Sequence, residues 1–171
     1  MTEGYGIRQA RVYERNALTR LAVRATRHLG YDNGFIERVT PTFAVTLRSI
    51  MVGDVQVCED ESLSVVGVVS VGSTLVQRAL VPGSRRTLAI VVLGGIFVEP
   101  AQWRRGIGRR LFAAAVARAR ERGAGVLMIN AEPSAEGFYQ RLGAIRVGES
   151  PFDVSPDVIL PLLMYMMPRE V

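Results

Sequence analysis

The stretch EPAQWRRGIGRRLF, residues 99–112, decides the fold of this chain. It follows the apolar run LAIVVLGGIFV (residues 88–98), typical of a buried strand, and precedes an alanine-rich pattern with a four-residue repeat, typical of a helix. A strand that enters a glycine turn and then a helix aims free N–H groups and the positive end of the helix dipole at that turn. Four arginines crowd around the two glycines despite their mutual repulsion, so we predict that an anion binds there.

Two common phosphate-binding loops do not fit this spacing. A P-loop requires Lys after its last glycine, and the chain contains no Lys. The dinucleotide fingerprint requires a small residue three positions after Gly108, where Leu111 stands. The anion is therefore expected to belong to another class of ligand.

Hydrophobic spacing along the chain predicts the elements around this turn. An apolar stripe over residues 11–29 predicts a helix that ends at Gly30, and residues 35–50 predict a short helix or a loop. Residues 53–60, 63–72 and 87–98 predict successive antiparallel strands, and the connection at 73–87 predicts either a projecting arm or a surface loop. A helix from residue 107 to Gly123, a strand at 125–130, a short helix ending at Gly143 and strands at 145–150 and 158–167 complete the order βααβββαβαββ.

Composition indicates an ordinary folded domain. The 171 residues are 49% apolar and 22% charged, and no linker divides them, so we expect a single domain over residues 5–171. All 21 basic residues are Arg, which favours GC-rich coding over a nucleic-acid partner as the origin of the net charge of +5. A single cysteine, Cys58, and an N-terminus without a signal sequence predict a cytoplasmic protein. The longest apolar run is about half of what a membrane span needs, so no membrane segment is expected.

The segment FVEPAQWRRGIGRRL (residues 97–111) resembles the acyl-CoA loop Q/R-x-x-G-x-G/A of the GNAT superfamily of acetyl-CoA-dependent N-acetyltransferases. Trp103 occupies the Q/R position, with Gln102 before it, so no side-chain role is assigned to residue 103. INAEPSAEGFYQRLGAIRVG (residues 129–148) is similar to the second signature of the family, with Ala144 in place of the usual aromatic residue. RHLGYDNGFIE (residues 27–37) resembles a stretch of one bacterial branch.

The resemblance implies an α/β fold with a mixed, mostly antiparallel sheet of about seven strands and about four flanking helices, splayed between the fourth and fifth strands. It implies that acetyl-CoA is the cofactor, with its pantetheine arm along the fourth strand and its phosphates in the glycine turn. The residues expected to bind it are Ile96, Phe97, Val98, Arg104, Arg105, Gly106, Ile107, Gly108, Arg109, Asn130, Ser134 and Phe138. No metal is expected.

Tyr139 is the expected catalytic residue, because in the family the corresponding tyrosine protonates the departing thiolate. Phe138 and Leu142 are spaced i, i+4 and should face the core, which would turn Tyr139 toward the strand opening. A half-buried packing role for Tyr139 is the alternative. We expect His28 to cap a helix and Cys58 to be a spectator on an edge-like strand.

The general base and the acceptor are left open by the sequence. Glu99, Asp32 and Glu37, a water chain or an amine of low pKa are the alternatives for the base. The acceptor is expected to be a primary amine of a small molecule or peptide that attacks the thioester directly, near Tyr31, Phe35, Glu37, Gly94, Gly95 and Phe152. A homodimer is possible. The rival functions are a non-enzymatic acyl-CoA sensor and a basic nucleic-acid-binding domain.

Overall fold

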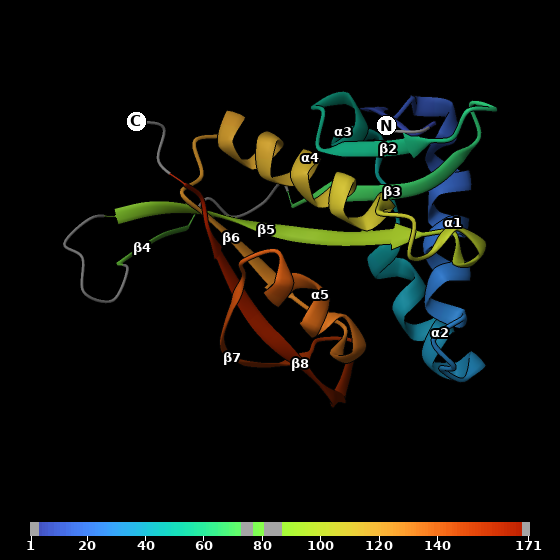
Figure 1. Ribbon diagram of the computed structural model, residues 1–171. Coiled ribbons are helices and arrows are strands. Elements are labelled where there is room, and N and C mark those ends of the chain that lie inside the picture. The colour runs from blue at the N-terminus through green and yellow to red at the C-terminus, as the bar shows by residue number, and fades with distance from the viewer. Residues whose placement is uncertain (1–3, 73–76, 81–86, 169–171) are drawn as a thin grey trace. The chain divides into compact units, whose positions relative to one another are not determined.

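The computed structural model describes residues 4–72, 77–80 and 87–168. The chain forms two compact units, each built from two separate stretches. The first unit comprises residues 1–70 and 95–115, and the second comprises residues 71–94 and 116–171. Strand β5 (Thr87–Val98) and helix α4 (Ile107–Glu121), both labelled in Figure 1, each contribute to both units.

In the first unit the strand order is β1 (Gly6–Gln9), β2 (Val55–Glu59), β3 (Val65–Val71) and the end of β5. Strands β1 and β2 and strands β2 and β3 pair antiparallel. The expectation that Cys58 lies on an edge-like strand is wrong, because β1 covers the free side of β2 and pairs Ile7 with Cys58. The predicted antiparallel succession of β2, β3 and β5 agrees with this order.

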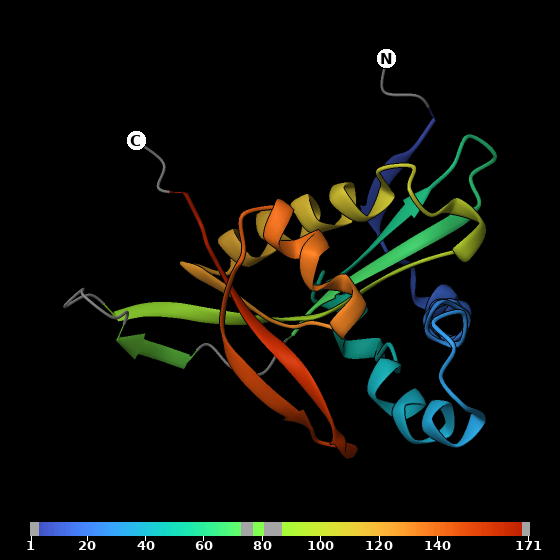
Figure 2. The ribbon, with the colours of Figure 1, turned by 60° about the horizontal axis from the view of Figure 1, so that its bottom comes forward.

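Helices cover both faces of β3 in the first unit. On one face, Leu18 and Leu21 of α1 (Arg15–Arg27) pack in one buried cluster with Val57 and Val68. On the other face, the start of α4 lies so close that a Cβ on Gly67 would meet Leu111 Cδ1 at 2.9 Å and Ile107 Cγ2 at 3.1 Å. Figure 2 shows α1 and α4 on opposite sides of these strands. Burial on both faces explains why five of the seven residues of β3 are valine, without the alternation of apolar and polar residues that one exposed face would give.

The segment predicted as a short helix or loop forms three short helices, all in the first unit. They are α2 (Asn33–Val39), the 3-10 helix η2 (Thr40–Phe43) and α3 (Leu47–Met51). A further 3-10 turn, η1 (Val12–Glu14), precedes α1. Pro41 near the start of η2 lacks the N–H that a continuous α-helix would need, which accounts for the interruption.

In the second unit, β5 pairs in parallel with β6 (Val126–Asn130), and β6 pairs antiparallel with β8 (Ser155–Met166). Strand β7 (Ile145–Phe152) pairs with β8, and α5 (Glu136–Arg141) packs on both, after the 3-10 turn η4 (Pro133–Ala135) (Figure 1). The parallel pairing joins Ile90–Leu93 of β5 to residues 126–129 of β6. The rest of β5, up to Val98, continues beyond this pairing, as the predicted splay between the fourth and fifth strands requires.

The connection predicted at residues 73–87 contains a strand, β4 (Gln77–Leu80), which pairs antiparallel with the start of β5. Residues 73–76 and 81–86 of this connection lie outside the described residues. The described part raises the number of strands in the sheet from the predicted seven to eight. Among the described residues, no helix combines the length and the apolar character that crossing a membrane requires.

Candidate functional site

The turn before α4 exposes the N-terminal N–H groups of that helix. The first helical hydrogen bond runs from the Arg110 N–H to the Gly106 carbonyl at 3.2 Å, so the N–H groups of the three residues between them have no carbonyl partner within the helix. Gly106 has φ +79°, a left-handed conformation that side chains disfavour, and a Cβ built there would meet nothing within 4 Å. This open turn matches the predicted anion site.

Three arginines at this turn have no partner within the described part of the chain. Arg104, Arg105 and Arg109 are exposed, and none of them makes an ion pair or a side-chain hydrogen bond with another described residue. Arg110 differs, because its Nη1 donates to the backbone carbonyl of Tyr5 at 3.3 Å. Three unneutralised guanidinium groups beside a helix N-terminus attract an anion.

Ile107, which the sequence assigned to the cofactor, contributes its backbone alone. Its side chain is 1% exposed and packs toward Gly67 of β3. Only its N–H group, in the first turn of α4, remains available to a ligand. Gly67 itself was missed by sequence reasoning, because a lone glycine within a valine run gives no sign of the helix that will pack against it.

The end of β5 turns alternate backbone groups toward opposite edges. The Glu99 N–H donates to the Val66 carbonyl of β3 at 2.9 Å, and the Phe97 carbonyl also lies on the β3 side, 3.3 Å from the Cβ position of Gly67. The polar groups of Ile96 and Val98 therefore point to the other edge of β5. Of the three residues predicted to offer backbone to pantetheine, Ile96 and Val98 face this edge. The Phe97 ring instead packs 4.9 Å from Phe43, against the core of the first unit.

A β-bulge explains Gly95, one of the paired glycines of β5. Backbone hydrogen bonds link Val66 to Glu99 and Gly72 to Val92. These two bonds are six residues apart on the β3 side and seven residues apart on β5, so β5 contains one extra residue. Gly95 takes up the extra residue with φ +146°, and a Cβ there would lie 2.7 Å from Cε2 of Phe97. A bulge and close packing thus account for Gly95, and the acceptor role given to Gly94 and Gly95 stays a prediction.

Trp103 has a side-chain contact that the sequence did not predict. Its indole Nε1 donates to the Val98 carbonyl at 2.8 Å. The imidazole of His28 meets the indole edge-on, with ring centroids 4.9 Å apart and planes at 90°. His28 is also the C-cap residue of α1, as predicted. The indole N–H of a tryptophan usually finds an acceptor, and this was the one available signal.

The candidate bases have different surroundings. Glu99 accepts hydrogen bonds from Arg24, one of them at 3.3 Å from Nε, and this contact raises the pKa of Arg24. Asp32 caps α2, accepting the Phe35 N–H at 2.9 Å. Glu37 is exposed, and none of the described residues pairs with it. Among the three predicted carboxylates, Glu37 alone keeps both oxygens open to solvent within the described part of the chain.

The aromatic residues predicted for the acceptor lie in different surroundings. In the first unit Tyr31 stacks on Phe35 with centroids 4.2 Å apart, and Phe35 is only 7% exposed. The Phe35 ring is therefore part of the core, with Tyr31 covering it. In the second unit Phe152 is half-buried at the end of β7.

Tyr139 in the second unit is buried, contrary to the expected orientation of α5. Its side chain is 6% exposed, whereas Phe138 and Leu142 are half-buried. Because α5 spans six residues and follows directly on a 3-10 turn, an i, i+4 spacing does not fix its buried face. Burial raises the pKa of the Tyr139 phenol well above its ordinary value of 10. The Phe138 ring lies 5.0 Å from that of Tyr139.

Two further predicted ligand residues have exposed positions in the second unit. Asn130 ends β6 with its side chain exposed. Ser134 lies in η4, where its N–H donates to Glu132 Oε2 at 2.8 Å and its hydroxyl donates to the same oxygen. The amide of Asn130 is open to a ligand, while Ser134 is engaged in its own turn.

A mixed sheet whose parallel strand leads through a bulge into an arginine-rich turn and a helix N-terminus defines an acyl-CoA N-acyltransferase fold. A family model described as an acetyltransferase (GNAT) domain matches residues 59–154, more than half of the chain. The chain belongs to this family, and the predicted fold class and family are confirmed. A comparison with the sequences of curated proteins found no match.

Solved structures of GNAT acetyltransferases share the fold at low sequence identity. A GCN5-related N-acetyltransferase from Rhodopseudomonas palustris is 14% identical with a TM-score of 0.73, covering 98% of each chain. The PaiA N-acetyltransferase from Thermoplasma acidophilum, solved with coenzyme A, is 14% identical with a TM-score of 0.68, over 95% of this chain and 99% of that one. A GNAT acetyltransferase from Brucella melitensis, solved with acetyl-CoA, is 20% identical with a TM-score of 0.61, over 98% of this chain and 90% of that one.

Proposed function

We propose that this chain, acting as a single domain over residues 5–171, transfers the acetyl group of acetyl-CoA to the primary amine of a small molecule or peptide. The observation that carries the proposal is the open N-terminus of α4 with three arginines that pair with none of the described residues, directly after the stretch of β5 that β6 does not pair. The fold shared with an enzyme solved with coenzyme A and another solved with acetyl-CoA supports the same ligand. We also propose that the protein is bacterial and cytoplasmic and that it can form a homodimer.

The pyrophosphate of acetyl-CoA is assigned to the turn before α4. Backbone N–H groups at Ile107, Gly108 and Arg109 donate to phosphate oxygens, and the absence of a side chain at Gly106 and Gly108 allows close approach. Arg104, Arg105 and Arg109 add charge-assisted hydrogen bonds. The ligand thereby neutralises guanidinium groups that otherwise repel one another.

The pantetheine arm is assigned to the edge of β5, bonding to Ile96 as an added strand would and to Val98 through its N–H alone, since the Val98 carbonyl accepts from Trp103. Asn130, Ser134 and Phe138 are proposed as further contacts. Acetyl-CoA supplies the acetyl group as a thioester, which an uncharged amine attacks directly. The Val98 N–H donates to the thioester carbonyl oxygen, where negative charge develops.

Tyr139 is proposed to donate a proton to the departing thiolate. The burial that raises its pKa keeps the phenol protonated over the working pH range, as a general acid requires. For the base, Glu37, a water chain or an amine of low pKa remains, since Glu99 and Asp32 are engaged with Arg24 and the Phe35 N–H. Tyr31, Phe35, Phe152, Gly94 and Gly95 are proposed to lie near the acceptor.

Thermal unfolding tests the proposed ligand. Acetyl-CoA should raise Tm, because a ligand that binds only the folded state stabilises it by mass action, and free acetate should not. Gly108→Asp places a carboxylate where phosphate approaches and should abolish the shift. The variant should fold, since an acidic residue in the first helical turn suits the dipole.

Ala113→Asp is the matched control, because it makes the same charge change at an exposed position of the same helix. The Ala113→Asp variant should keep the rise in Tm that acetyl-CoA causes in the parent. A folded Gly108→Asp variant with an undiminished shift contradicts the assignment of the turn to phosphate. A panel of amines with a thiol-release readout then tests transfer, and acetyl-CoA binding without transfer to any amine favours the sensor function.

A further inference from the structure

Trp103 holds the carbonyl group at the end of β5. The 3-10 turn η3 (Pro100–Gln102) folds the chain back, with the Gln102 N–H bonded to the Glu99 carbonyl at 2.8 Å and the Trp103 N–H bonded to the Pro100 carbonyl at 3.2 Å. This brings the indole Nε1 to 2.8 Å from the Val98 carbonyl oxygen. A side chain five positions along the chain thus binds the backbone of the last strand residue.

The peptide group between Val98 and Glu99 is fixed at both ends as a result. Its carbonyl accepts from Trp103, and its N–H donates to Val66 of β3 at 2.9 Å. Because a peptide group is planar, two opposed hydrogen bonds set its orientation. In an extended strand the N–H and the carbonyl of one residue point to the same edge, so a fixed carbonyl limits how far Val98 can rotate and with it the direction of its N–H along this edge of β5.

The last turns of α1 hold the indole in place. His28 packs edge-on against the Trp103 ring, and Arg24, four residues earlier on the same helix, binds the Glu99 carboxylate. One helix end therefore secures both ends of the η3 turn. This support fixes the rotamer of a side chain that is itself 39% exposed.

We propose that Trp103 is a positioning residue for acetyl transfer, which aims the Val98 N–H at the thioester carbonyl by holding the Val98 carbonyl. This inference rests on the proposed function. Interactions that strengthen as charge develops on the carbonyl oxygen raise kcat, whereas interactions equal in ground state and transition state change only affinity. The loss of the indole N–H should therefore lower kcat with little change in the Kd for acetyl-CoA.

The chain offers a direct test, because Trp103 is its single tryptophan. Biosynthetic replacement of tryptophan by 3-benzothienylalanine changes this one residue, keeping the ring shape and replacing N–H by sulfur. We expect kcat, measured by thiol release, to fall about tenfold, less than the 10²-fold cost of a ~1 Å misplacement, because water can reach the half-exposed indole site. Trp103→Phe should show the same loss, and calorimetry should give a Kd for acetyl-CoA within about twofold of the parent.

Tyr5→Phe is the matched control. It removes another hydrogen bond of the same turn, from the Tyr5 hydroxyl to Gln102 Oε1 at 3.0 Å, but leaves the Val98 carbonyl held. Its kcat should equal that of the parent. Parental kcat in both Trp103 variants, or an equal loss in Tyr5→Phe, overturns the proposal.

A spectroscopic measurement separates this inference from the proposed function. If the parent binds acetyl-CoA but acetylates no amine, the infrared stretching frequency of the bound thioester carbonyl decides. A Val98 N–H aimed at that oxygen predicts a lower frequency in the parent than in the benzothienyl variant, and equal frequencies overturn the inference. A parent that does not bind acetyl-CoA overturns the proposed function and the inference with it.

Discussion

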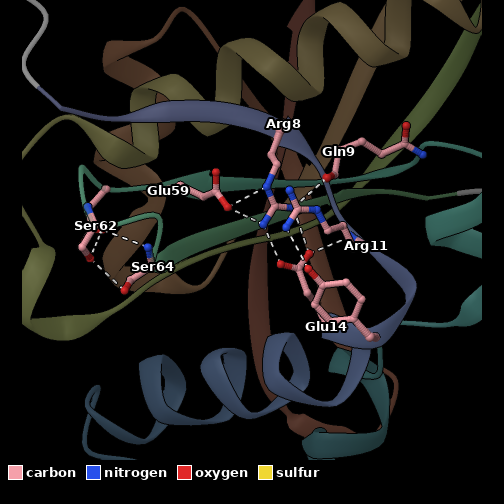
Figure 3. Close-up of polar contacts among 9 residues, drawn as sticks. Arg8, Gln9, Arg11, Glu14, Glu59, Ser62 and Ser64 are labelled. Carbon is pink, nitrogen blue, oxygen red and sulfur yellow. Dashed lines mark hydrogen bonds and ion pairs between the residues drawn. The ribbon is translucent and has the colours of Figure 1, made fainter.

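The guanidinium of Arg8 binds the carboxylate of Glu14 through two hydrogen bonds, Nη1 to Oε2 at 2.9 Å and Nη2 to Oε1 at 2.6 Å. Figure 3 shows that the same guanidinium also binds Glu59 on β2. Its Nε donates to Glu59 Oε1 at 2.7 Å. Arg8 thus ties β1 to β2 and to the turn before α1. Glu14 is only 9% exposed, so its charge depends on this partner.

Arg8→Met should lower the free energy of unfolding by roughly 1 to 3 kcal/mol, because it leaves two largely covered carboxylates without their cation. Urea unfolding at neutral pH measures the loss. Arg20→Met, at an exposed position on α1, is the control and should change stability by less than about 0.5 kcal/mol. Equal effects of the two variants would show that the cluster contributes nothing specific.

The same cluster predicts how stability responds to acid. The hydrogen bond from Arg8 lowers the pKa of Glu14 below its ordinary 4.5. A lowered folded pKa contributes stability that is present above pH 4.5 and is lost as pH falls through the folded value. The stability difference between parent and Arg8→Met should therefore shrink from about pH 5 to pH 3, and a difference independent of pH would argue against the ion pair.

Single alanine variants of Arg104, Arg105 and Arg109 should each weaken acetyl-CoA binding by about 1 to 3 kcal/mol, the range for a hydrogen bond to a charged group. Their exposure predicts unchanged stability. Calorimetric titration measures the affinity, and Arg20→Ala serves as a control for the change in net charge. If the three variants bind acetyl-CoA as tightly as the parent does, the backbone N–H groups alone bind the anion.

Tyr139→Phe keeps the buried ring and removes the proton proposed to reach the leaving sulfur. We expect kcat to fall on the order of 10² to 10⁴, with Kd for acetyl-CoA within a few-fold. The loss should shrink with a thioester whose thiol leaves more readily. Because burial raises the pKa of Tyr139, the parent should keep this acid protonated up to at least its ordinary pKa of 10.

Tyr13→Phe is the control for this experiment, since Tyr13 is 76% exposed and lies outside the proposed site. It should match the parent in kcat. If Tyr139→Phe also matches the parent, the phenol is a packing group and the thiolate leaves without an acid.

Cys58 should resist thiol reagents in the folded protein. The side chain is 0% exposed between β1 and β3, and burial raises the pKa of its thiol, so little thiolate is present to react. Titration with 5,5′-dithiobis(2-nitrobenzoate) should give no reaction in buffer and complete reaction in urea. Rapid labelling of the native chain would contradict this environment and reopen a covalent acyl-cysteine route.

Local spacing was enough to predict the central part of the fold. The strand, the glycine turn and α4 were predicted because a four-residue apolar repeat fixes a helical face and glycine marks the turn before it. The same stretch of sequence placed the arginines at this turn, where the structure has Arg104, Arg105 and Arg109 exposed. By contrast, α5 is too short for its spacing to define a face: Phe138 and Leu142, expected to face the core, are half-buried, and Tyr139 is the buried residue.

Tertiary structure alone decided the contacts that join distant segments. Arg24 and Glu99 are 75 residues apart, and no periodicity in either segment indicates that they meet. Cys58 is interior because β1 pairs beside it, and Trp103 is held because α1 ends against its ring. Sequence spacing determines which side chains share a face of one element, but the partner of that face depends on strand order and on which helix covers which side of the sheet.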